Sequence, residues 1–115
     1  RFFVFAFNGY FMHEFLYRQY TRSRQLARNI KWLSGNDLSA YISGNPDLYV
    51  MNKSDGKALA VGLWNFFQDY IKEPVVTLDK NYSKIKFINC TGKLENNTVY
   101  LSKIQPYEFV AFEVE

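Results

Sequence analysis

The chain has 115 residues and a net charge of +3, with 48% hydrophobic and 22% charged residues. Such values are typical of a folded domain with its own core, and they exclude disordered, collagen-like and low-complexity chains. The single cysteine, Cys90, excludes an intrachain disulfide, and with the single histidine, His13, it excludes a Cys/His zinc cluster. No run of about 18 apolar residues occurs, so we expect no membrane-spanning helix. We also expect no metal and no cofactor.

The N-terminal part is aromatic and basic. Nine of the 22 aromatic residues fall within the first twenty positions, and residues 1–33 carry six basic side chains against one acid. These basic residues spread over the polar side of an expected helix and match no nucleic-acid motif, so we expect no nucleic-acid site. The chain begins at Arg1, with no initiator methionine and no signal-peptide pattern. This start predicts a fragment of a longer protein, with the cytoplasm as the favoured location.

The first expected elements are a strand and a long helix. Residues 2–7 form a continuous apolar run, which predicts a strand buried on both faces, and Asn8-Gly9 predicts a turn after it. Residues 10–33 repeat apolar side chains at three- and four-residue spacing without glycine or proline, as is typical of one amphipathic helix. A strand of this kind needs neighbouring strands, so residues 1–33 are predicted to be part of a larger α/β domain.

The remaining residues predict an antiparallel β fold. Residues 34–46 are rich in glycine, asparagine and serine and are expected to form a connector. From residue 47 onward apolar and polar residues alternate, with turn signals every 8–12 residues. Strands are expected at residues 48–52, 59–65, 75–78, 85–90, 93–95, 98–101 and 107–114. The predicted fold is mainly β: an antiparallel β-sandwich of six or seven strands at 47–115, preceded by one strand and one long amphipathic α-helix.

Six stretches of the chain combine into a known layout. They are residues 2–9, 29–33, 44–49, 60–66, 101–107 and 109–112. This layout resembles the C-terminal end of bacterial glycoside hydrolases that have a (β/α)8 catalytic barrel. The resemblance implies that residues 1–33 are the last strand and helix of an upstream barrel and that residues 47–115 are a terminal β domain. In such enzymes the terminal domain is usually non-catalytic and packs against the barrel.

No catalytic residue is expected within the chain itself. Glycoside hydrolysis needs two carboxylates, and the strand–helix part offers only Glu14. Catalytic groups of a barrel follow the ends of its strands, whereas Glu14 lies about one turn into the expected helix. An acid in the first turn of a helix is favoured by the helix dipole.

Asn8 and Tyr10 are candidates for contact with a carbohydrate substrate. If residues 2–7 are a barrel strand, both residues lie at its active-site end. Asn8 could then hydrogen-bond a sugar hydroxyl, and Tyr10 could stack on a sugar ring. The alternative is an ordinary turn built from turn-favouring residues.

Trp64 and Phe66 are the second pair of candidate substrate-binding residues. With Phe67 and Tyr70 they form an aromatic cluster near a strand end, and such a cluster could be a sugar-stacking platform. The alternative, which we favour, is packing in a core or at a domain interface, where large aromatic side chains are common.

Three functions are compatible with these observations. The leading hypothesis is a non-catalytic C-terminal module of a bacterial glycoside hydrolase, with the upstream barrel of the same polypeptide as its partner. The second is a carbohydrate-binding module that uses its surface aromatics. The third is an interaction domain that forms homo-oligomers through residues 1–33.

Overall fold

The computed structural model describes residues 20–35, 38–42, 45 and 47–115. The chain divides into two compact units, Arg1–Leu38 and Ser39–Glu115, and we call the second the β unit. The strand expected at residues 2–7 and the candidates Asn8 and Tyr10 lie outside the described residues, as does the first part of the expected helix.

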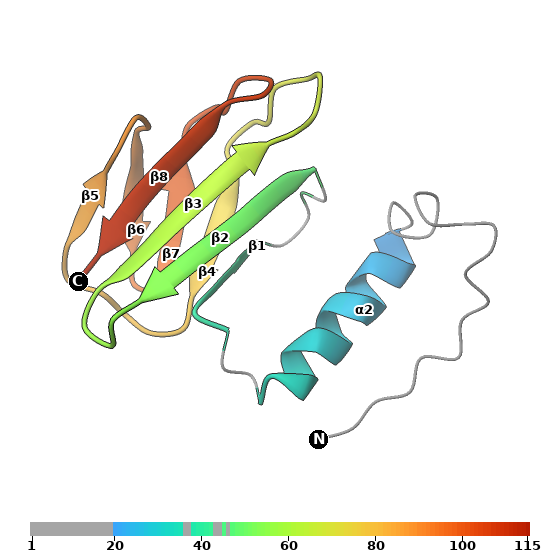
Figure 1. Ribbon diagram of the computed structural model, residues 1–115, viewed down its shortest axis with the longest axis horizontal. Helices are drawn as coiled ribbons and strands as arrows, with labels where there is room; N and C mark the ends of the chain where they lie inside the picture. Colours follow the sequence, from blue (N-terminus) through green and yellow to red (C-terminus); the bar gives the residue numbers. More distant parts are fainter. Residues whose placement is uncertain (1–19, 36–37, 43–44, 46) are drawn as a thin grey trace. The chain divides into compact units, whose positions relative to one another are not determined.

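Among the described residues there is one helix, α2, which spans Tyr20–Leu33 (Figure 1). It ends where the sequence predicts, because Gly35 takes a left-handed backbone conformation with φ +76°. The amide of Ser34 donates to the carbonyl of Ile30 (2.9 Å), and that of Gly35 donates to Trp32 (3.1 Å). Ile30 and Leu33, which belong to the expected apolar stripe, are exposed.

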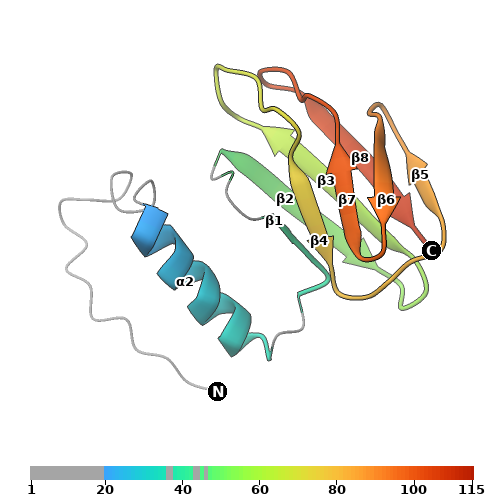
Figure 2. The same ribbon diagram turned by 180° about the vertical axis from the view of Figure 1, so that it is seen from behind.

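The β unit contains eight antiparallel strands among its described residues, in two sheets of four. One sheet has the order β1-β4-β7-β6 and the other the order β2-β3-β8-β5, as the front and back views show (Figures 1 and 2). The bounds are β1 Ala40–Ile42, β2 Leu48–Ser54, β3 Leu59–Asn65, β4 Val75–Leu78, β5 Ile85–Phe87, β6 Gly92–Glu95, β7 Thr98–Leu101 and β8 Phe109–Val114.

Two tight hairpins connect neighbouring strands, and polar side chains stabilise their turns. In the β2–β3 turn the Asp55 carboxylate accepts hydrogen bonds from the amides of Lys57 (2.9 Å) and Ala58 (2.8 Å). These bonds favour the ionised form and lower the pKa of Asp55. In the β6–β7 turn Asn96 has a φ of +56°, which asparagine tolerates better than most residues.

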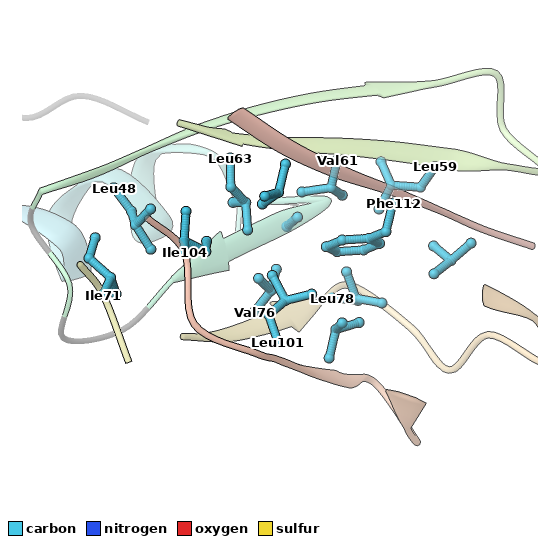
Figure 3. Close-up of a cluster of buried hydrophobic side chains, with 14 residues drawn as sticks. Leu48, Leu59, Val61, Leu63, Ile71, Val76, Leu78, Leu101, Ile104 and Phe112 are labelled. Atoms are coloured by element: carbon cyan, nitrogen blue, oxygen red, sulfur yellow. The ribbon is translucent and has the colours of Figure 1, made fainter. Parts of the chain in front are cut away.

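One hydrophobic core lies between the two sheets (Figure 3). Alternate residues of each strand point into it because side chains of a strand alternate between the two faces. Phe112 is its largest fully buried side chain. The core members are Ala40, Leu48, Leu59, Val61, Leu63, Ile71, Val76, Leu78, Val99, Leu101, Ile104, Val110, Phe112 and Val114. This arrangement of two facing sheets around a shared core is sandwich-like.

The mainly β fold with antiparallel strands after one helix is confirmed, and the strand count differs from the expected six or seven. The additional strand is β1, which lies inside the segment expected to be the connector 34–46. It pairs with β4, with Ala40 opposite Leu78. The β unit accordingly begins at Ser39, eight residues before the expected start at residue 47.

Candidate functional site

The structure brings Trp64 and Phe66 together at the surface of the β unit. Trp64 is an outward-facing residue of β3 and is 38% exposed, and Phe66, just beyond β3, is 56% exposed. Their rings stack with centroids 4.7 Å apart and planes inclined by 20°. The two residues of the second predicted pair therefore form one contiguous surface feature.

Further apolar side chains extend this feature across the outer face of the β2-β3-β8-β5 sheet. The strand registers place Tyr49 opposite Trp64 and Trp64 opposite Phe109, so one row crosses three strands. The next row contains Met51, Gly62 and Ala111. All of the large side chains here are apolar and exposed. This is unusual, because the outer face of an antiparallel sheet is normally polar. We call this surface the aromatic face; its residues are Tyr49, Met51, Gly62, Trp64, Phe66, Phe109 and Ala111.

The rings of the aromatic face meet mostly at steep angles. Tyr49 meets Phe66 edge to face, with centroids 6.0 Å apart and planes inclined by 75°. Phe109 meets Trp64 in the same way, at 6.0 Å and 72°. Edge-to-face and offset-stacked contacts are the arrangements that aromatic rings prefer. The face is therefore a packed cluster of rings that contact one another.

Gly62 allows the ring of Phe109 to lie against the backbone of β3. A Cβ atom at position 62 would stand 2.8 Å from Cζ and 2.9 Å from Cε2 of Phe109. Any larger residue would therefore displace the ring. The ring of Phe109 therefore fills the space over Gly62 at the centre of the aromatic face.

Two asparagines hold the backbone that carries these rings. Asn65 is fully buried, and its Nδ2 donates to the carbonyls of Asp69 (2.8 Å) and Gln105 (2.9 Å). Its Oδ1 accepts from the amide of Phe67 (2.9 Å). Asn89 accepts from the amide of Ala111 (3.1 Å) and donates to the carbonyl of Phe109. The loop after β3 and the start of β8 are thus tied in place from both sides.

The outer face of the other sheet has a different character. Its rows place Tyr41, Thr77, Thr98 and Glu95 side by side, and then Val75, Tyr100 and Lys93. Lys93 and Glu95 form an ion pair of 2.8 Å, and Lys93 also lies over the ring of Tyr100 at 5.0 Å. This is a mixed polar surface of the kind that faces water.

Tyr70, the fourth member of the expected cluster, has a different environment. The ammonium groups of Lys103 and Lys72 lie 4.2 Å and 5.8 Å from its ring centroid. The ring of Trp64 contacts those of Phe66 and Phe109. Of the expected cluster, Trp64 and Phe66 are in contact, and strand register adds Phe109 and Tyr49 to them.

Cys90 is a free cysteine and is half-buried. Its Sγ lies 3.2 Å from the carbonyl of Ala111, to which the thiol donates. Burial raises the pKa of the Cys90 thiol, so the reactive thiolate is disfavoured. Over the described ranges, no group of three or more metal-ligating side chains is found, and no helix combines the length and hydropathy needed to cross a membrane.

The sequence prediction missed Tyr49, Met51 and Phe109 as members of this surface. Strand alternation alone could have placed all three on an outer face, because each occupies an outward position of its strand. Their contact with Trp64 depends on the pairing of β3 with both β2 and β8. Comparison with protein-family models, with curated proteins and with solved structures finds no match.

Proposed function

We propose that the β unit is a non-catalytic module of a bacterial glycoside-hydrolase-like protein and that it works by contact with other protein surfaces. The observation that carries this proposal is the aromatic face: exposed, contiguous and built from packed rings. Exposed apolar patches of this kind mark interaction sites. The glycoside-hydrolase-like parent is inferred from the resemblance of the chain to the terminal β domains of such enzymes.

The composition of the aromatic face favours a protein partner. Interface centres are enriched in tyrosine, tryptophan, phenylalanine and methionine, and the face contains all four. Charged residues lie at one end of the face. There a third row of outward residues, next to the Gly62 row, contains Lys53, Ala60 and Glu113. An apolar centre with a polar rim is the usual anatomy of a protein interface.

The helix α2 supports the part of the proposal that concerns an upstream barrel. Ile30 and Leu33, three residues apart on one side of the helix, are exposed on it. Apolar side chains at this spacing normally pack against a neighbouring element. The last helix of a barrel would bury such residues against the rest of that barrel.

A carbohydrate-binding module is the second candidate, because Trp64 and Phe66 are exposed. Sugar rings stack on open aromatic faces. Here one face of Trp64 is covered by Phe66, and Tyr49 and Phe109 stand nearly perpendicular to their neighbours. These angles disfavour a flat platform for a polysaccharide chain.

Isothermal titration of the chain against oligosaccharides from cellulose, xylan, starch and chitin separates the two candidates. We expect no heat beyond dilution with any of them, because the rings pack on each other. Trp64→Ala serves as the control variant. Heat with the natural chain that disappears in Trp64→Ala would establish carbohydrate binding and overturn the proposed function.

A further inference from the structure

The aromatic face is self-complementary about β3, the middle of its three central strands. In the third outward row, Lys53 on β2 and Glu113 on β8 lie on either side of Ala60. In the second row, the long side chain of Met51 and the short one of Ala111 lie on either side of Gly62. In these two rows β2 thus carries a positive charge and a long side chain, and β8 carries a negative charge and a short side chain.

We infer that the occupant of this face is a second copy of the same chain, related by a two-fold axis along β3. This inference rests on the proposed function, since it names the partner of the same surface. A two-fold axis in this direction lays β2 of each copy over β8 of the other. Lys53 then meets Glu113 of the second copy, and Met51 meets Ala111 of the second copy.

Symmetry doubles every contact of this kind. In an isologous interface a pair between residues i and j is repeated between j and i, so the dimer contains two Lys53–Glu113 pairs. Ala60, Gly62 and Trp64 of β3 lie on the axis, and the ring of Phe109 covers Gly62, so aromatic rings rather than backbones meet there. The aromatic row meets itself, with Tyr49 near Phe109 of the second copy.

Competing groups around the proposed ion pair are few among the described residues. Glu113 is half-buried, and Lys86 of β5 lies opposite it in the register of the same sheet. Neither Lys86 nor Glu113 forms an ion pair with another described residue, whereas Lys93 and Glu95 do so on the other sheet. The carboxylate of Glu113 can therefore serve a cation from outside the chain.

The size of the face sets the expected affinity. Strands lie about 4.8 Å apart and outward residues about 7 Å apart, which gives three strands and three rows an area on the order of 300 Å². Two such faces bury about 600 Å² in total, which is below the roughly 1,000 Å² of a stable complex, so the dimer is weak and transient. We therefore expect a dissociation constant on the order of 100 µM.

Sedimentation equilibrium of the full 115-residue chain tests the inference. We expect a monomer–dimer equilibrium, and we expect Lys53→Glu or Glu113→Lys alone to weaken it by about tenfold, since each reversal places two like-charge pairs in the dimer. An equimolar mixture of the two variants restores opposite charges in both pairs of the heterodimer. Its dissociation constant should return to within about threefold of the natural chain.

The controls separate this inference from other forms of assembly. Lys93→Glu makes the same charge change on the outer face of the other sheet and should leave the dimer unchanged. The double variant Lys53→Glu/Glu113→Lys should also dimerise like the natural chain, because its pairs are reversed but intact.

Two results would overturn the second copy as occupant. One is a natural chain that stays monomeric up to millimolar concentration. The other is a dimer that neither single reversal weakens, which would place assembly elsewhere, such as at residues 1–33. Neither result by itself affects the proposed function, which fails only if the oligosaccharide titrations give heat that depends on Trp64.

Discussion

Replacing Phe112 with alanine is expected to lower the free energy of unfolding of the β unit by about 4 kcal/mol. Phe112 is fully buried between the two sheets. It lies on β8 opposite Val61 of β3 and Phe87 of β5, and its ring centroid is 6.4 Å from that of Phe87. Alanine would leave a cavity that three strands cannot close without breaking their register.

Urea unfolding followed by circular dichroism measures this effect, and Phe109→Ala is the matched control. Phe109 lies on the same strand but points outward and is 40% exposed. Its replacement is expected to cost about 1 kcal/mol. If the alanine variant does not fold, Phe112→Leu replaces it, and its loss in free energy of unfolding should lie between those of Phe109→Ala and Phe112→Ala. Equal losses at positions 109 and 112 would contradict the placement of the core.

Asn65→Leu is expected to destabilise the β unit by about 3 kcal/mol, although leucine is the more hydrophobic residue. The substitution removes three side-chain hydrogen bonds and leaves the carbonyls of Asp69 and Gln105 and the amide of Phe67 without these partners. A buried polar group left without a partner destabilises the folded state by more than one hydrogen bond stabilises it. Asn81→Leu, at an exposed position, is the control and should change stability little.

Asn65→Asp sharpens this prediction through its dependence on pH. A carboxylate at this buried position would face two carbonyl oxygens, so its pKa in the folded state would lie above that in the unfolded state. Stability is then greatest below the unfolded-state pKa and falls as the pH rises through the folded-state pKa. Urea unfolding at about pH 4 and about pH 7 should show the larger loss at the higher pH. An unchanged loss would contradict the burial of this side chain.

Much of the strand pattern can be read from the sequence because sheets alternate with a period of two. The bounds of β3, β4 and β7 are those predicted from alternation and turn residues. The β1 strand was missed because its three residues gain their partner, β4, from a distant part of the chain. No local pattern marks so short a strand between glycine- and serine-rich segments.

Positive backbone φ angles explain where predicted strands were too long. The strand expected at residues 85–90 ends at Phe87, because Asn89 has a φ of +47° and bonds to β8 with its side chain instead. The strand expected at 107–114 begins at Phe109, because Tyr107 has a φ of +58°. Such angles leave the β region and end a strand.

The candidate site was only partly predictable for a related reason. Trp64 and Phe66 stand out in the sequence as large aromatic residues at a strand end. The remainder of the face comes from β2 and β8, and its assembly depends on which strands pair and in which register. The polar rows of the other sheet contain aromatic residues too, so aromatic content alone does not distinguish the two faces.

The fluorescence of Trp64 tests the central claim, that the aromatic face is a protein contact surface occupied by a second copy. Trp32→Phe removes the other tryptophan, so emission then reports on Trp64 alone. As the chain concentration is raised through the range in which dimers form, we predict a shift of emission to shorter wavelength and reduced quenching by iodide. Emission and quenching that stay constant while sedimentation reports dimers would contradict the account.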